Sequence, residues 1–448
     1  MQQAPTRRRW LRSKWTIGTG ILLLLALPLL ALVAWDYLSL QWADKELARL
    51  QAAGSPVTAD DLETFYALPA GADDVTRLWL SASDPLETKA FSGAAVTLPI
   101  VGEGEAEIPP PGEPWPQLEE ARRLLLNYQE QLSQLHEAAA RGGAARYPTQ
   151  FSAGFEMLLP HVQPLRVAAR LLALEAHVKA HDGDAQGAAR SIHAIFKVAG
   201  SLEREPVLVS QLVRFTMDGV GREALESLLP HTAFADKDLL ILQTDLLAVD
   251  YETAIVRALQ GDRVTCLAVF RDPRVMGKEA SVFLWRMTRG QDLQMYLTQM
   301  DHSIEAASLP TPASRAALDD LERQLKTAKS SVVKRLGHHL SLQLLNGVNA
   351  ASASFRGTAF NRAAATALAV ERHRRIHGAL PKSLQDLPPS LLSPIPTDPF
   401  DGKPLRYAIR GDGFVVYSVG EDGKDDGGEE DHSGKPDAVF TVKRGLRK

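Results

Sequence analysis

The chain has 448 residues, of which 45% are hydrophobic and 23% charged, an ordinary composition for a globular protein of two or three domains. Its formal net charge is −4 and it has no basic patch with interleaved aromatic residues, which argues against nucleic acid as a partner. A single cysteine, Cys266, excludes an internal disulfide, and its apolar neighbours predict a buried structural thiol rather than a nucleophile.

A basic tail and a long apolar segment open the chain. Residues 1–14 carry five bases (Arg7, Arg8, Arg9, Arg12 and Lys14), and the 21 residues from Trp15 to Trp35 carry no charge. A helix of this length spans a hydrocarbon core about 30 Å thick. The positive-inside rule then places residues 1–14 in the cytoplasm and the rest of the chain outside. The segment 15–35 is therefore predicted to be the transmembrane helix of a single-pass protein of the cell inner membrane.

A cleaved signal peptide is the alternative interpretation of the same segment. Cleavage favours small residues in an A-x-A-like pattern, whereas both candidate sites here, Leu29–Ala31 and Leu32–Ala34, have leucine at the outer position. The apolar run is also longer than a usual signal-peptide core. An uncleaved anchor that contacts the lipid bilayer is the favoured interpretation.

Residues 36–116 are interpreted as a stalk followed by a loop region. Helical spacing continues from Leu38 to Gln51, directly after the apolar segment. The stretch Gly93–Pro116 contains three consecutive prolines and four glycines, which predicts an ordered loop rather than a helix.

Residues 117–357 are predicted to form an α-helical body. Leu165–Ala180 and Ala185–Leu202 have the pattern of an antiparallel helix pair, with Asp184 as the cap of the second helix. This pair resembles one tetratricopeptide-like hairpin, but no second copy follows at a fixed spacing, so a repeat solenoid is not supported. Other helical patterns cover Leu118–Ala140, Pro206–Leu229, Asp236–Leu259, Val282–Ala307, Thr311–Arg335 and Leu340–Ile376.

Candidate catalytic and metal-binding groups in the body are isolated. His177 and His181 are four residues apart on a predicted helix, as are His373 and His377, but neither pair has an evident third metal ligand. Ser331–Lys334 matches the S-x-x-K motif of acyl-serine enzymes without its companion motifs. We interpret the histidines as surface or helix-end residues and the S-x-x-K match as a coincidence.

The composition changes in residues 358–448. Seven prolines lie between Pro381 and Pro404, and the hydrophobic period then switches to two. Leu405, Tyr407 and Ile409 precede the turn Arg410–Gly413, and Phe414 and Val416 follow it. This pattern predicts a β-hairpin.

The order of motifs in this region resembles the C-terminal module of the major pseudopilin of type II secretion systems. The quoted motifs are a helix ending in RRIHGALP, then DPFDGKPLRY, the hairpin, and YSVGEDG. The hydrophobic helix and peptidase cleavage motif that precede this module in a pseudopilin are absent. The resemblance therefore implies a small α/β module, residues 358–448, attached to a different, membrane-tethered helical body.

The same resemblance implies a calcium ion in the acidic loop Glu421–Asp431. Carried over onto this sequence, its ligands are the carbonyl of Val419 and the carboxylates of Asp422 and Asp431. The loop has seven acids, one base and three glycines, which suits the oxygen-rich coordination of calcium. The alternative is a solvated acidic loop that binds no ion.

The sequence thus predicts a mainly α protein with one N-terminal transmembrane helix, a multi-helix extracytoplasmic body and a small C-terminal α/β module with a β-hairpin. We expect a non-enzymatic scaffold or interaction protein with protein partners in the envelope, linked to secretion or envelope assembly. No small-molecule substrate is identified. The alternative is a membrane-anchored hydrolase of unknown substrate, which would require a deep polar cleft with converging catalytic groups.

Overall fold

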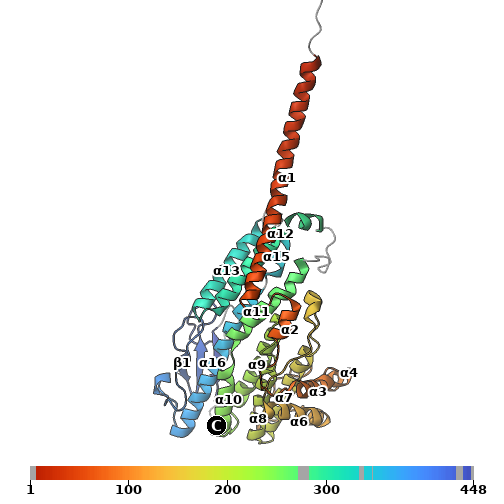
Figure 1. Cartoon of the computed structure of the whole chain (residues 1–448). Coiled ribbons are helices and arrows are strands. Elements are labelled where there is room, and N and C mark those ends of the chain that lie inside the picture. Colours follow the sequence, from red (N-terminus) through yellow and green to blue (C-terminus); the bar gives the residue numbers. More distant parts are fainter. Residues whose placement is uncertain (1–6, 271–281, 332–337, 346, 430–436, 445–448) are drawn as a thin grey trace, which may run out of the picture.

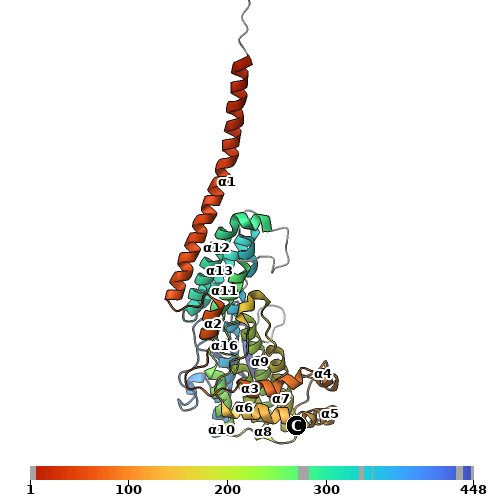
Figure 2. The ribbon, with the colours of Figure 1, turned by 45° about the vertical axis from the view of Figure 1, so that its right-hand side comes forward.

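A computed structural model describes residues 7–270, 282–331, 338–345, 347–429 and 437–444. In this part of the chain the fold is mainly helical, with one three-stranded antiparallel sheet near the C-terminus, which confirms the predicted mainly α class (Figure 1). Figures 1 and 2 both show an elongated body from which the long helix α1 (Arg7–Ala52) projects.

The first half of the body is built from short helices followed by longer ones. They are α2 (Ala59–Phe65), α3 (Thr76–Ser83), the 3₁₀ turn η1 (Asp84–Leu86), α4 (Lys89–Ala95), α5 (Leu118–Asn127), α6 (Gln129–Arg141), η2 (Phe151–Glu156), α7 (Val162–His181), α8 (Ala185–Gly200) and α9 (Leu208–Leu228).

The second half contains the remaining helices and the sheet. They are α10 (Asp236–Ala248), α11 (Tyr251–Leu267), η3 (Ala268–Phe270), α12 (Val282–Ser308), α13 (Ala313–Ser330), α15 (His339–Leu344), α16 (Gly347–His377), η6 (Leu384–Asp386), β1 (Arg406–Arg410), β2 (Gly413–Ser418) and β3 (Ala438–Val442).

The C-terminal part of α1 packs against α12. The backbone N–H of Gly290 donates to the Asp36 carboxylate at 2.6 Å. A Cβ atom at Gly290 would lie 2.2 Å from the Asp36 carbonyl oxygen, so only glycine allows the two helices to approach this closely. Farther along α1, Ala43 is fully buried. These contacts fix the direction in which the N-terminal part of α1 leaves the body.

The predicted transmembrane helix, residues 15–35, lies within α1, but most of its side chains are outside the described part of the chain. No helix among the described residues is both long enough and apolar enough to cross a membrane. The transmembrane part of the predicted fold is therefore not confirmed. The basic tail, residues 1–14, is likewise largely outside the described side chains.

The predicted helix pair is present as α7 and α8. The Asp184 carboxylate accepts the Gly187 N–H at 2.8 Å and caps α8, as expected, while Gly183 adopts φ +79° in the turn. Alanines on the facing surfaces, such as Ala168 and Ala194, have no exposed area, so the two helices lie close together. Helix α9 packs against both.

Two of the predicted helices are interrupted, and one predicted loop begins inside a helix. Leu118–Ala140 is interrupted at Tyr128, and Asp236–Leu259 is interrupted at Val249. At the second break Asp250 accepts the Thr253 N–H at 2.9 Å and begins α11 as its cap. The predicted loop Gly93–Pro116 begins inside α4, which ends at Ala95.

The C-terminal sheet contains the predicted hairpin and one strand that was not predicted. In the hairpin, β1 and β2 pair with Arg410 opposite Gly413, which leaves Gly411 and Asp412 as the two-residue turn. Strand β3 pairs antiparallel with β2 on its other side. All six residues of β2 are buried, because α16 packs on the sheet.

The main hydrophobic core runs continuously through regions predicted as separate. Trp79 of α3, Leu171 of α7, Leu368 of α16 and Phe414 of β2 belong to one cluster of contacting buried side chains. Helix α16 begins at Gly347 and so crosses the predicted boundary between residues 357 and 358. The C-terminal module therefore packs as part of the body.

The buried carboxylate of Asp398 connects several segments of the C-terminal module. It has no exposed area and accepts hydrogen bonds from the N–H groups of Phe400 and Val419, both at 2.9 Å. The Ser418 hydroxyl donates to it at 2.8 Å and the Arg406 guanidinium at 2.6 Å. These four donors compensate a buried negative charge and join the DPFDG turn to β1 and to the end of β2.

Replacing Asp398 is expected to destabilise this module strongly. Asp398→Ala leaves the N–H groups of Phe400 and Val419 without their acceptor and removes one of the carboxylates that Arg406 contacts, while the ion pair of Arg406 with Asp401 remains. We expect a cost of about 2–5 kcal/mol of unfolding free energy, at about 1–3 kcal/mol for each buried group left unpaired. The measurement is hydrogen exchange of the β2 amides together with urea denaturation. Asp412→Ala, in the exposed hairpin turn, is the control and is expected to change stability by less than about 0.5 kcal/mol. A similarly small effect for Asp398→Ala would contradict this role.

Candidate functional site

The acidic loop after β2 is anchored at its first residues. Val419 is buried, and its N–H is bonded to Asp398. Glu421 forms an ion pair with Arg356 of α16, and its carbonyl accepts a hydrogen bond from Arg315 of α13. The start of the predicted calcium loop is therefore fixed to two helices of the body.

The predicted calcium ligands are only partly described. The Asp422 carboxylate accepts the Lys424 N–H at 2.9 Å, and the Lys424 ammonium lies 3.5 Å from its other oxygen. Asp431 lies outside the described residues. Among the described residues, no three His, Cys, Asp or Glu side chains are grouped so as to hold a metal ion. The predicted set of Val419, Asp422 and Asp431 therefore stays a prediction.

Asp437 is an acidic residue of this region that sequence reasoning missed. It directly precedes β3 and is 3% exposed. Its Oδ2 accepts the Gly428 N–H at 2.9 Å, while its buried Oδ1 has no hydrogen-bond partner among the described residues. Burial raises the pKa of the Asp437 carboxyl, and the charges of Asp426 and Asp425 add to the increase. A buried oxygen beside other carboxylates is a suitable ligand for a hard cation.

The histidine pairs do not form a metal site in the described structure. The His181 ring nitrogen Nε2 lies 2.9 Å from the Pro109 carbonyl oxygen. His177 is buried, and burial together with the neighbouring His181 lowers its pKa to about 4. The rings of His373 and His377 are 4.3 Å apart at the end of α16. Of the S-x-x-K match, Ser331 is described and Lys334 is not.

Cys266 is buried at the end of α11, as predicted. Burial raises the pKa of its thiol to about 12, and the nearby Asp262 carboxylate adds to the increase. A thiol with this pKa is protonated at neutral pH and is a poor nucleophile.

A buried carboxylate between α7, α6 and α8 brings together residue types found in hydrolases. The Ser191 hydroxyl and the His136 Nε2 both lie 2.7 Å from the same Glu175 oxygen, and the Lys179 ammonium lies 2.9 Å from the other. A nucleophilic serine must contact a base. Here serine and histidine both contact the acid, and Ser191 has no exposed area. The cluster therefore serves packing rather than acyl transfer.

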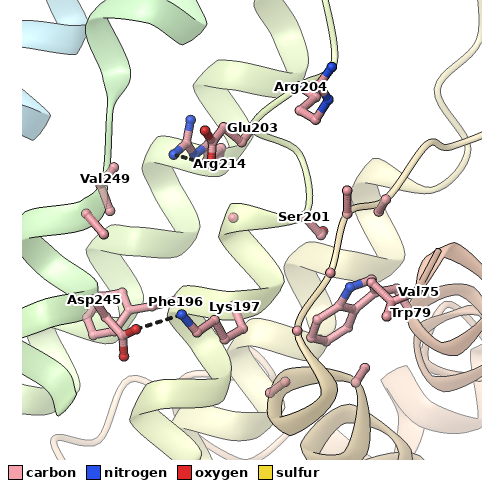
Figure 3. Close-up of a pocket in the computed structure, with 18 residues that line it drawn as sticks. Val75, Trp79, Phe196, Lys197, Ser201, Glu203, Arg204, Arg214, Asp245 and Val249 are labelled. Carbon is pink, nitrogen blue, oxygen red and sulfur yellow. Dashed lines mark ion pairs between the residues drawn. The ribbon is translucent and has the colours of Figure 1, made fainter. Parts of the chain in front are cut away.

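A cleft of about 270 Å³ opens between α6, α8, α9 and α10 (Figure 3). Its charged residues are largely paired. Lys197 and Asp245 form an ion pair at 2.8 Å, and the Arg214 guanidinium lies 3.8 Å from Glu203. The Ser201 hydroxyl in its wall lies 2.6 Å from the Val198 carbonyl and accepts from Tyr147. These groups leave no free nucleophile and base side by side in this cleft.

Comparisons with known proteins give no relative: no protein-family model matches the chain, and no characterised protein or solved structure is found to be similar.

The Glu175 cluster predicts a specific acid sensitivity. Burial raises the pKa of this carboxyl, but His136 and Lys179 outweigh burial and bring it to about 2. Because the folded pKa is below the unfolded value of 4.5, the stabilisation is complete above about pH 4.5 and is lost as the pH falls toward 2. We expect Glu175 to account for a loss of about 2 kcal/mol of unfolding free energy between pH 5 and pH 3.

Urea denaturation at these two pH values measures the effect. Glu175→Gln is expected to lose less stability on acidification than the wild type by about that amount. Glu137→Gln, an exposed position one residue from His136, is the control and is expected to follow the wild type. Parallel pH dependences for Glu175→Gln and the wild type would show that Glu175 is not the titrating group.

Proposed function

We propose that this protein is a membrane-anchored scaffold or interaction protein of the bacterial envelope, with its body outside the inner membrane. The observation that carries the proposal is the exposure of apolar side chains on the projecting part of α1. Leu27, Leu30 and Trp35 are 63%, 64% and 63% exposed, and Val33 is 54% exposed. A bilayer removes such side chains from water, and the basic residues before them orient the helix by the positive-inside rule.

The character of the body supports a scaffold rather than an enzyme. The buried acids that were candidates for chemistry, Glu175 and Asp398, each contact three or more donors. The serines beside them, Ser191 and Ser418, are fully buried. Buried groups with this many hydrogen-bond donors fix the positions of helices and strands. A scaffold that binds protein partners in the envelope requires such a fixed arrangement.

We also propose that the acidic loop of the pseudopilin-like module binds calcium. The proposed ligands are the Val419 carbonyl and the carboxylates of Asp422 and Asp431, to which we add Asp437. The support for Asp437 is its buried oxygen without a hydrogen-bond partner and the neighbouring charges of Asp425 and Asp426. A divalent cation would offset the repulsion among these carboxylates.

Membrane anchoring and orientation are tested in bacterial spheroplasts. We expect the full-length chain to resist carbonate extraction, and external protease to remove the body while leaving a small protected N-terminal fragment. Aspartate at both Leu27 and Leu30 costs about 3 kcal/mol of insertion at each position and is expected to release a large fraction of the chain. Leu158→Asp, at a position 80% exposed on the body, is the control. A body protected from external protease would overturn the orientation.

Calcium binding is tested by thermal denaturation with increasing calcium. At several millimolar calcium we expect a stabilisation of about 1–2 kcal/mol, because external modules bind calcium at roughly 10⁻⁴–10⁻³ M and binding favours the folded state. Asp422→Ala and Asp437→Asn are expected to abolish the shift, and Asp431→Ala to weaken it. Asp412→Ala is the control with a normal response. The absence of any shift in the wild type would mean that the loop is a solvated acidic turn.

A further inference from the structure

A second, larger cavity lies on the other side of α7 from the Glu175 cluster. Its volume is about 680 Å³, within the usual range for sites that bind small molecules. The segment from Pro99 to Ile108 forms one wall, and the C-terminal halves of α7 and α9 form the others. Figures 1 and 2 place α7 in the part of the body away from the projecting end of α1. Its apolar lining residues are Pro99, Ile100, Ala106, Ile108, Ala173, Val220 and Ala224.

Arg170 brings a positive charge into this cavity without a paired acid. No ion pair or hydrogen bond of its guanidinium is present among the described residues. Arg166, one turn earlier on α7, has a buried Nε that also lacks a hydrogen-bond partner. Burial lowers the pKa of Arg170, and the charge of Arg166 adds to the decrease. Like charges four residues apart destabilise a helix, and an anion bound at Arg170 would reduce this repulsion.

The wall opposite Arg170 contains backbone strain. Ile100 adopts φ +67°, and the Val101 N–H donates to the Pro99 carbonyl at 2.7 Å, which is the hydrogen bond of a γ-turn. A γ-turn with positive φ at its centre is rare and strained, and a β-branched residue there is unusual. Such strain occurs at ligand-binding sites. Here it brings Ile100 into the lining of the cavity.

The other polar groups restrict the charge of the ligand. His177 is neutral at pH 7, because burial and His181 lower its pKa to about 4, and it therefore adds no positive charge. Two carboxylates, Glu107 and Glu223, also line the cavity and are exposed. They oppose a phosphate dianion, whereas a single carboxylate can pair with Arg170 in a two-point hydrogen bond.

We propose that this cavity binds a carboxylate monoanion with a compact apolar body. Arg170, with Arg166 behind it, binds the carboxylate, and the side chains of Ile100, Ile108 and Val220 contact the apolar part. The source of such a group is either a free organic acid or the C-terminus of a peptide that ends in an apolar residue. This proposal does not depend on the membrane anchor or on calcium.

The test is ligand binding to the full-length chain in a non-ionic detergent, followed by NMR with hexanoate, N-acetyl-leucine and the neutral control hexanamide. We expect both carboxylates to bind in the millimolar range and hexanamide to bind at least about 10-fold more weakly, since a hydrogen bond to a charged group contributes this much. Tighter binding of N-acetyl-leucine favours a peptide C-terminus, and tighter binding of hexanoate favours a free acid.

Arg170→Gln is the deciding variant. We expect it to weaken carboxylate binding about 10-fold or more while raising the melting temperature of the ligand-free protein, because it removes repulsion with Arg166. Arg190→Gln, at an exposed arginine of the adjacent helix α8, is the matched control and is expected to leave binding unchanged.

A second variant tests the apolar wall. Ile100→Gly accepts positive φ and is expected to weaken both carboxylates several-fold while retaining their preference over hexanamide. Three results would overturn the proposal: no binding of either carboxylate, equal binding of hexanoate and hexanamide, or a lower melting temperature for Arg170→Gln. The last result would identify the guanidinium as a structural group.

Discussion

Close packing around helix α16 is the constraint on which the rest of the structure depends. Its middle, from Ala359 to Val370, contains six alanines with no exposed area, so the helix is buried on all sides rather than along one stripe. Helices α9, α10, α11 and α13 and the strands β2 and β3 all pack against it. At Gly357 a Cβ atom would lie 2.2 Å from the Phe215 ring, so a larger residue there would separate α16 from α9. At the end of α16, the buried Glu371 carboxylate accepts hydrogen bonds from arginines of the same helix and from Arg444 beyond β3.

Local sequence patterns were sufficient to predict those elements whose structure is determined by residues close together in the chain. The α7–α8 turn was predictable because Gly183 and Asp184 satisfy the requirements of a helix end and a cap within four residues. The β1–β2 hairpin was predictable because alternating apolar residues flank a glycine-containing two-residue turn. The helix breaks at Tyr128 and Val249 could not be predicted, because the helical spacing of apolar residues continues across both positions. At Tyr128 the ring packs edge-on against Phe91 of α4, 5.0 Å away, a contact that no local pattern indicates.

The candidate sites were less predictable than the fold, because they too depend on contacts between residues that are distant in the sequence. Asp437 was missed because β3 was not predicted, and only the pairing of β3 with β2 brings this carboxyl beside Gly428. Arg166 and Arg170 look like ordinary charges of a solvated helix surface in the sequence. That Arg170 lines a cavity follows from the position of the segment Pro99–Ile108 beside α7, which is distant in the sequence. The alanine pattern of α7 indicated which face of the helix packs against α8. It did not indicate which segment would cover the opposite face.

Besides the buried Asp437 oxygen in the acidic region, two parts of the described structure contain marked local conflicts. One is the projecting α1, where Leu27 and Trp35 face solvent, and the other is the cavity beside α7, which Arg170 lines together with the strained turn at Ile100. Between them, buried charges such as Glu175, Asp398 and Glu371 have several donors each. Natural proteins tend to retain local conflicts at functional sites and satisfy the same groups elsewhere. The two differ in chemistry, since the first exposes apolar side chains and the second holds a guanidinium without an ion-pair partner among the described residues. Figure 2 shows α7, which lines the cavity, in the part of the elongated molecule away from the projecting end of α1. In the proposed membrane-anchored arrangement, α7 and the cavity that it lines would lie on the side of the body away from the bilayer.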